Sequence, residues 1–157
     1  MKFKYTGIGK LLRQLVVSFK KLLHLRDSTH EIALGFAVGV FIGILPTFGF
    51  GALFLAGLAV IIRFNIFAGI VGTLVNNPIF VPFWLASSYK VGEIITKTGI
   101  DIKEKSIIEN IFGFGLSYFI GNIILAILVG FISYFIIYII VEIYRESRKK
   151  LKNNSKT

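Results

Sequence analysis

Three long stretches without a charged residue constrain this chain more than any other feature. They cover residues 32–62, 64–89 and 110–141. Each exceeds the roughly 20 residues that a helix needs to cross the hydrocarbon core of a bilayer. Hydrophobic residues make up 55% of the chain, more than an ordinary soluble domain carries. The runs therefore predict an all-α, polytopic membrane protein.

Basic residues gather at the two ends of the chain. The net charge is +10, of which residues 1–31 contribute +5 and residues 142–157 contribute +4, whereas residues 90–109 are neutral. Cytoplasmic segments of membrane proteins are rich in Lys and Arg, so both termini are predicted to be cytoplasmic. Because most aromatic residues lie in the apolar runs rather than among the basic ones, no nucleic-acid partner is expected.

Residues 8–26 have the period of an amphipathic helix, with one apolar face and one basic face. The pattern predicts a helix in the headgroup plane, with its basic side chains toward anionic lipids of the bilayer. A solvated helix that packs on the protein's own cytoplasmic side is the alternative. The candidate membrane-surface residues are Lys10, Arg13, Lys20 and Lys21.

Local signals divide the chain further. Ser28 and Glu31 have the spacing of a capping box at the start of the first run. Gly113 and Gly115 predict a break between a short interfacial piece and a final span near 117–141. The expected division is an amphipathic interfacial helix at 1–27, a membrane domain at 28–141 and a basic cytoplasmic tail at 142–157.

All three prolines lie in the first two runs. Pro46 follows 14 apolar positions, and a helix of that length reaches only roughly 21 Å, which is too short to cross a bilayer. A turn over residues 46–49 would then let the chain come back as a re-entrant hairpin. The second run repeats the arrangement, with 14 positions before Pro78.

The charges leave two topologies open. If the first run is re-entrant, Arg63 stays cytoplasmic, the second run crosses with a kink, and residues 90–109 lie outside. If the second run is re-entrant instead, Arg63 lies outside. The first arrangement is preferred because it satisfies every charge, whereas three plain crossings would place the basic tail outside.

The proline breaks are the candidate ligand site. We expect Asn76 or Asn77 to cap a new helix that has Pro78 in its first turn, with free N–H groups near an anionic headgroup. Paired interrupted segments are also the best sequence indication of a transporter's binding site. The candidate ligand-binding residues are Thr47, Thr73, Asn76, Asn77 and Pro78. A purely structural kink remains the alternative.

Two further patterns bear on function. Gly35, Gly39 and Gly43 form a small-residue stripe that would let another helix approach closely. The chain has no Cys, only two His, and no acidic residue inside an apolar run. No catalytic motif, metal site or cofactor motif is found, so an enzyme is not expected.

The order of these motifs resembles a bacterial membrane family, domain of unknown function 2062. The resemblance covers roughly residues 28–141 and departs at Asn76, where a small polar residue such as Ser is expected. It implies a protein of the bacterial inner membrane, and some relatives are joined to glycosyltransferase-type domains. The matching positions are Gly35, Phe36, Gly39, Gly43, Pro46, Gly72, Thr73, Asn77, Pro78, Pro82, Tyr89 and Gly92.

Two functions fit these expectations. The first is transport or flipping of an anionic lipid or polyprenyl-phosphate carrier in envelope biogenesis. Because 157 residues offer few helices to enclose a path, that function implies a homo-oligomer. The second is a non-catalytic membrane scaffold for an envelope glycosyltransferase.

Overall fold

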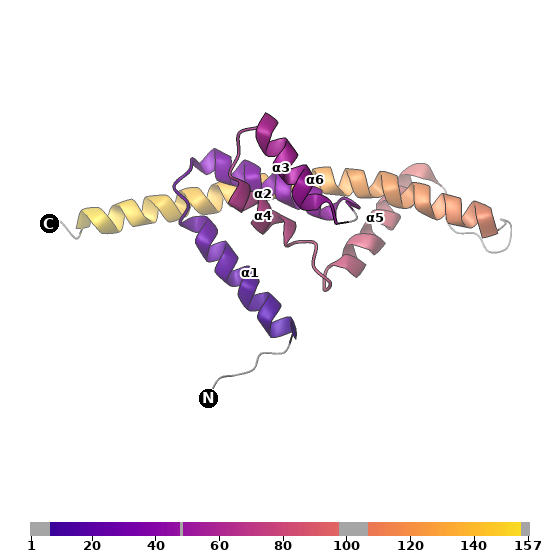
Figure 1. Ribbon diagram of the computed structural model, residues 1–157, viewed down its shortest axis with the longest axis horizontal. Coiled ribbons are helices and arrows are strands. Elements are labelled where there is room, and N and C mark those ends of the chain that lie inside the picture. Colours follow the sequence, from indigo (N-terminus) through magenta and orange to yellow (C-terminus); the bar gives the residue numbers. More distant parts are fainter. Residues whose placement is uncertain (1–6, 48, 98–106, 155–157) are drawn as a thin grey trace.

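A computed structural model describes residues 7–47, 49–97 and 107–154. These residues contain six α-helices and no strand, which confirms the all-α class (Figure 1). One of the described helices is long and apolar enough to cross a membrane, over Ile108–Leu151. The helices are α1 (Gly7–Leu23), α2 (Thr29–Ile44), α3 (Gly51–Ile61), α4 (Ile66–Thr73), α5 (Val81–Thr96) and α6 (Ile107–Asn154).

The start and the end of α2 follow the signals in the sequence. The Ser28 hydroxyl accepts a hydrogen bond from the Glu31 amide at 3.1 Å, and the Ser28 amide donates to the Glu31 carboxylate at 3.0 Å. The predicted capping box is therefore confirmed. The helix ends before Leu45, which adopts an extended conformation because it precedes Pro46.

Helices α2 and α3 form an antiparallel hairpin. Gly49 in the connecting turn has a φ of +93°, a conformation that an L side chain rarely adopts. Beyond α3 the chain is back at the first turn of α2, where the Asn65 amide donates to the Glu31 carbonyl at 3.0 Å. Arg63 Nε lies 3.0 Å from the Glu31 carboxylate. The hairpin thus begins and ends at the same level of the structure.

Helix α4 then runs parallel to α2 with their backbones in close contact. The Asn65 side chain caps α4 by accepting a hydrogen bond from the Ala68 amide at 2.7 Å. A Cβ atom added to Gly39 would lie 1.9 Å from the Gly69 carbonyl oxygen, and one added to Gly35 would lie 2.3 Å from that of Asn65. Only glycine lets the two helices lie this close.

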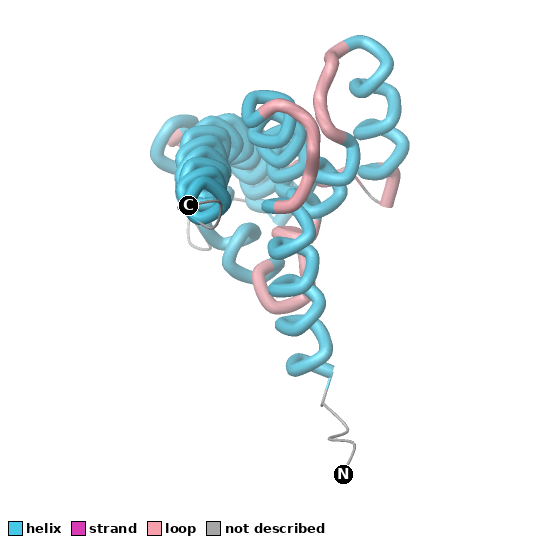
Figure 2. Tube along the Cα trace, turned by 90° about the vertical axis from the view of Figure 1, so that its left-hand side faces the viewer, coloured by secondary structure: helices cyan, strands magenta, loops and turns pink. Residues whose placement is uncertain are grey.

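Helix α6 forms the long axis of the structure and runs antiparallel to both α2 and α5. Figure 1 shows α2 and α4 beside one part of α6, and α5 beside another. A Cβ atom added to Gly92 of α5 would lie 1.6 Å from the Ser117 carbonyl oxygen of α6. Figure 2 shows α1 leading away from the other helices. Its last turn is anchored by Leu22, which is fully buried with Ile32 and Val141.

One local expectation is wrong. The helix α6 is continuous through Gly113 and Gly115, so no break separates an interfacial piece from the span. A helical glycine costs only about 1 kcal/mol relative to alanine, which packing outweighs. Here the Phe114 ring stacks on Tyr89 of α5, with 4.9 Å between ring centroids, and also on Tyr118. Helix α6 also continues without interruption into the basic C-terminal segment.

Candidate functional site

The turns that contain the two proline breaks lie next to each other. A cavity of about 250 Å³ is lined by Thr47 and Gly49 from the first turn and by Thr73 and Asn76 from the second segment. A second cavity of about 220 Å³ shares Thr47, Gly49 and Asn76 with the first and extends to Tyr118 of α6. We call these two adjoining cavities the tip cleft, because they lie at the tip of the α2–α3 hairpin.

The tip cleft offers neutral polar groups. Thr73 Oγ1 donates to the Ile70 carbonyl at 2.8 Å, so its hydroxyl is partly used within α4. Asn76 is exposed and Thr47 is half-buried. No charged side chain is found among the described residues that line the two cavities. The cleft can therefore hydrogen-bond a polar group, but its described lining offers no carboxylate or imidazole for proton transfer.

Asn77 faces away from this cleft and builds the turn itself. Its side-chain oxygen accepts from the Ile79 amide at 3.0 Å, and its side-chain nitrogen donates to the Leu74 carbonyl at 2.9 Å. The side chain is buried, with only 7% exposed, and both ends of its amide are bonded to nearby backbone. Pro78 is exposed in the same turn.

The helix that follows Asn77 begins three residues later than the sequence predicts. Helix α5 begins at Val81, with Phe80 as a cap that makes no side-chain hydrogen bond, and Pro82 rather than Pro78 lies in its first turn. The reason is that the Asn77 carbonyl accepts from the amides of both Phe80 and Val81, which forms a separate turn before the helix.

Asn122 is a buried polar residue that the sequence reasoning missed. Its side-chain nitrogen donates to the Ile44 carbonyl at 3.0 Å and to the Ser88 hydroxyl at 3.1 Å, so one amide joins α2, α5 and α6. It is 1% exposed, and its side-chain oxygen has no hydrogen-bond partner within the described residues. The available signal was an amide in the middle of the apolar run 110–141.

A larger and more apolar groove lies between α1 and the other helices. Its volume is about 680 Å³, and we call it the α1 groove. Lys20 is the one charged side chain among its described lining residues, and Asn77 and Ser133 are the polar ones apart from it. Its lining is formed by Val16, Phe19, Lys20, Leu23, Phe36, Val40, Val71, Gly72, Leu74, Val75, Asn77, Phe80, Val129 and Ser133.

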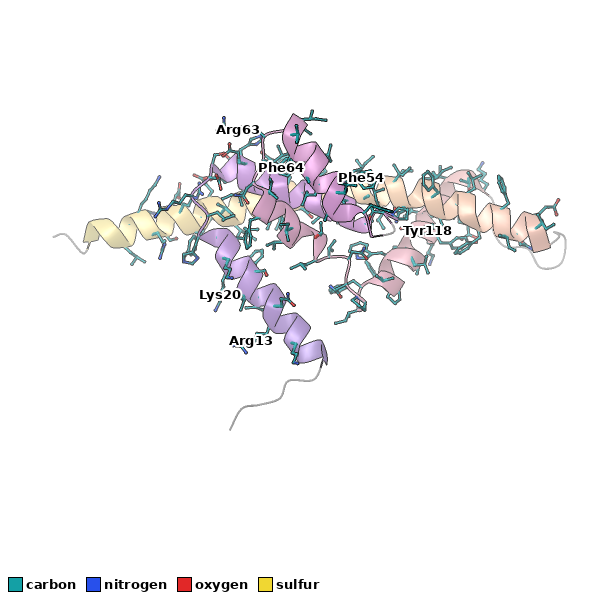
Figure 3. The ribbon with its side chains drawn as sticks, viewed as in Figure 1. Arg13, Lys20, Phe54, Arg63, Phe64 and Tyr118 are labelled. Atoms are coloured by element: carbon teal, nitrogen blue, oxygen red, sulfur yellow. The ribbon has the colours of Figure 1, made fainter. Side chains whose placement is uncertain are left out.

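The candidate surface residues of α1 are all exposed. Figure 3 shows Arg13 and Lys20 on the same side of the helix. Helix α1 has two Lys residues in its last turn and no acidic residue in its first. The four exposed basic residues are Lys10, Arg13, Lys20 and Lys21.

The glycine stripe lies inside the structure rather than on a free surface. Gly35 and Gly39 contact α4, and a Cβ atom on Gly43 would lie 3.1 Å from Val75. The two His residues share hydrogen bonds of 2.8 Å with tyrosines of α6, His24 with Tyr144 and His30 with Tyr134. In the described part of the chain, no group of three or more His, Cys, Asp or Glu could hold a metal ion.

The comparisons with known proteins agree with the order of the sequence motifs. A family model described as an uncharacterised protein conserved in bacteria, domain of unknown function 2062, matches residues 12–150. No curated protein and no solved structure matches the chain.

Proposed function

This chain belongs to the bacterial family called domain of unknown function 2062, and from that premise we propose that it is a multi-pass protein of the inner membrane. In this proposal the polar headgroup of an anionic lipid or polyprenyl-phosphate carrier passes between the leaflets at the tip cleft. The protein acts as a flippase without a proton-transferring carboxylate in the cleft.

The surface supports placement in a membrane. Large apolar side chains are exposed along α3 and α6, for example Val60 at 87%, Ile108 at 79% and Phe112 at 71%. Contiguous apolar surfaces of this kind are rare on soluble monomers and mark contact with a membrane or a partner. The long apolar helix within Ile108–Leu151 is the element that would cross.

The hairpin geometry favours the first of the two topologies. Helix α2 has 16 residues and is therefore about 24 Å long, less than the roughly 30 Å of hydrocarbon. Since Arg63 pairs with Glu31 at the start of α2, the α2–α3 hairpin would enter and leave on the same side. The segment from α4 to α5 would then cross, and α6 would return to the cytoplasm.

The meeting of the two broken segments is the observation that carries the proposal. Helix α2 ends and helix α5 begins around the tip cleft, with Thr47 and Asn76 on its wall. Interrupted helices leave backbone groups available at mid-membrane depth, and in transporters such places bind the substrate. A polar headgroup in transit needs hydrogen-bonding groups of this kind where lipid offers none.

A flipping assay tests the proposal. The purified chain is reconstituted into liposomes that contain a fluorescent phosphatidylglycerol, and its arrival in the outer leaflet is followed by dithionite quenching. We expect Thr47→Trp, which fills the cleft, and Asn76→Leu to slow flipping several-fold. The control Gln14→Leu also replaces an exposed side-chain amide with leucine, but on α1, and this variant should flip the lipid at the wild-type rate.

The proposal fails if wild-type liposomes flip no faster than empty ones, or if all three variants behave alike. A single-cysteine series gives a second readout, since the chain has no cysteine of its own. Thr47→Cys and Asn76→Cys should react with a water-soluble maleimide, whereas Asn77→Cys should stay protected.

A scaffold for an envelope glycosyltransferase is the second candidate. It is favoured by an exposed aromatic pair on α6, Phe131 and Phe135, whose ring centroids lie 4.9 Å apart. A leucine at Gly39 would not test this role, because it would separate α2 from α4. Phe131→Ala tests the scaffold role. If this variant loses co-purification with the glycosyltransferase while flipping is unchanged, the scaffold is favoured over the flippase.

A further inference from the structure

The α1 groove has the form of a lipid-chain site. Helix α1, which leads away from the other helices in Figures 1 and 2, forms one wall of the groove. Residues of α2, α4 and α6 are among those that line the rest. Its volume of about 680 Å³ lies within the range of roughly 300–1,000 Å³ that is typical of small-ligand sites. Its walls are aliphatic and aromatic over most of their length.

We propose that the α1 groove holds an acyl chain of an anionic phospholipid whose phosphate contacts Lys20. The inference rests on the proposed membrane placement but not on flipping at the tip cleft. The two sites share no lining residue among those described. Even the neighbouring residues Asn76 and Asn77 are divided, since Asn76 lines the cleft and Asn77 lines the groove.

Charge complementarity selects the occupant. Lys20 borders the groove and is also exposed, and its long apolar stem can line the wall while its ammonium stays at the surface. Helix α1 as a whole carries four basic residues and no acidic residue. A neutral lipid would cover the apolar wall but offer no negative charge to Lys20, and an acidic peptide would offer the charge but not cover the wall. An anionic phospholipid does both.

The groove runs in the direction that a bound lipid chain would take. Lys20 and Leu23 lie near the end of α1 that leads into α2, where the capping box and Arg63 also lie. From there the lining continues along α4 to the turn at Asn77 and Phe80. A lipid held with its phosphate at Lys20 would therefore direct its chain from the predicted cytoplasmic surface toward the bilayer interior.

The chain supplies its own probe of this site. Trp84 is the one tryptophan in the sequence, and it packs against the buried cluster of Val40, Ile44 and Ala126. Its ring nitrogen donates a hydrogen bond to the Val75 carbonyl at 3.1 Å, and both Val40 and Val75 line the groove. Bromine atoms on a lipid chain quench tryptophan fluorescence at short range. Because Trp84 also lines the tip cleft, the part of its quenching by a brominated lipid that Ser133→Phe removes reports occupation of the groove.

The full chain is reconstituted in phosphatidylcholine nanodiscs, and increasing fractions of brominated phosphatidylglycerol or brominated phosphatidylcholine are added. We expect half-maximal quenching at an about 5-fold lower fraction of phosphatidylglycerol, the preference that one lysine near an anionic lipid gives. Lys20→Gln should remove the preference. The matched control Lys21→Gln, on the same helix but outside the groove lining, should keep it.

A second pair of variants tests the chain site. Ser133→Phe fills the groove and should weaken quenching, whereas Ile132→Phe on the exposed side of α6 should not. The proposal is overturned if both brominated lipids quench equally, if Lys20→Gln and Lys21→Gln behave alike, or if Ser133→Phe has no effect. It is also overturned if single cysteines at Val16 and Ser133 cross-link two chains, since a second copy would then occupy the groove. Loss of flipping with the lipid preference retained would reject the proposed function alone.

Discussion

The closest backbone contact between α2 and α4 gives the sharpest prediction, for Gly39→Ala. The added Cβ would lie 1.9 Å from the Gly69 carbonyl oxygen and 2.8 Å from its carbonyl carbon. Because these are backbone atoms, no side chain can rotate away, and the two helices must separate by about 1 Å. Overpacking of this kind costs typically about 1–3 kcal/mol.

Gly57→Ala on α3 is the matched control, because nothing lies within 4 Å of the added Cβ. That substitution should stabilise the chain by up to about 1 kcal/mol through helix propensity alone. The two variants should therefore differ by about 1–4 kcal/mol. For a chain of this size such a gap corresponds to about 2 to 16 °C in melting temperature.

Thermal unfolding of the two purified variants, in the same detergent and followed by circular dichroism, measures the gap. We expect Gly39→Ala to melt below the wild type and Gly57→Ala to melt at or above it. Equal melting temperatures for the two variants would refute the close approach of α2 and α4. A loss in both would show instead that α3 packs against something at Gly57.

Three other predictions concern the Glu31 carboxylate, the buried amide of Asn122 and the membrane topology. The backbone amide and hydroxyl of Ser28, and then Arg63, hold the pKa of Glu31 below its ordinary value of 4.5. Its contribution to stability is therefore present above pH 4.5 and lost as the pH falls through the lowered value, so the melting temperatures of wild type and Glu31→Gln should converge only in acid. Asn122→Leu leaves the Ile44 carbonyl without its donor and should cost about 1–3 kcal/mol in chemical denaturation, and an unchanged midpoint would contradict its bridging role. Arg63→Cys should react with an impermeant maleimide in inverted vesicles and Lys97→Cys in intact cells, and labelling of both cysteines in intact cells would favour the alternative topology.

The sequence predicted those features that depend on neighbouring residues. The Ser28 capping box and the end of α2 before Pro46 involve contacts within a few positions, so their spacing is visible in the chain. The hairpin turn was expected for the same reason. The start of α5 was misplaced because Asn77 forms a turn of its own, a choice between two local structures that Pro78 alone does not decide.

The features that were missed depend on distant residues. Gly113 and Gly115 suggested a break, but the aromatic stack with α5 covers this part of α6 and keeps it helical. The importance of Asn122 arises from Ile44 and Ser88, which lie 78 and 34 positions away. The candidate ligand residues were only partly brought together, since Thr47, Thr73 and Asn76 share a cavity while Asn77 faces the other side.

The length of α6 sets where the membrane boundary falls in the proposed placement. Its apolar run of 32 residues is about 48 Å long, and burying all of it in roughly 30 Å of hydrocarbon would need a tilt of about 50°, beyond the usual 0–40°. One end of the run must therefore project from the hydrocarbon. The stacked rings of Tyr89, Phe114 and Tyr118 lie in the part of α6 nearer α5, and Tyr118 also lines the tip cleft. In the proposed placement the ring stack would thus lie at the depth of the cleft and hold α5 against α6 there.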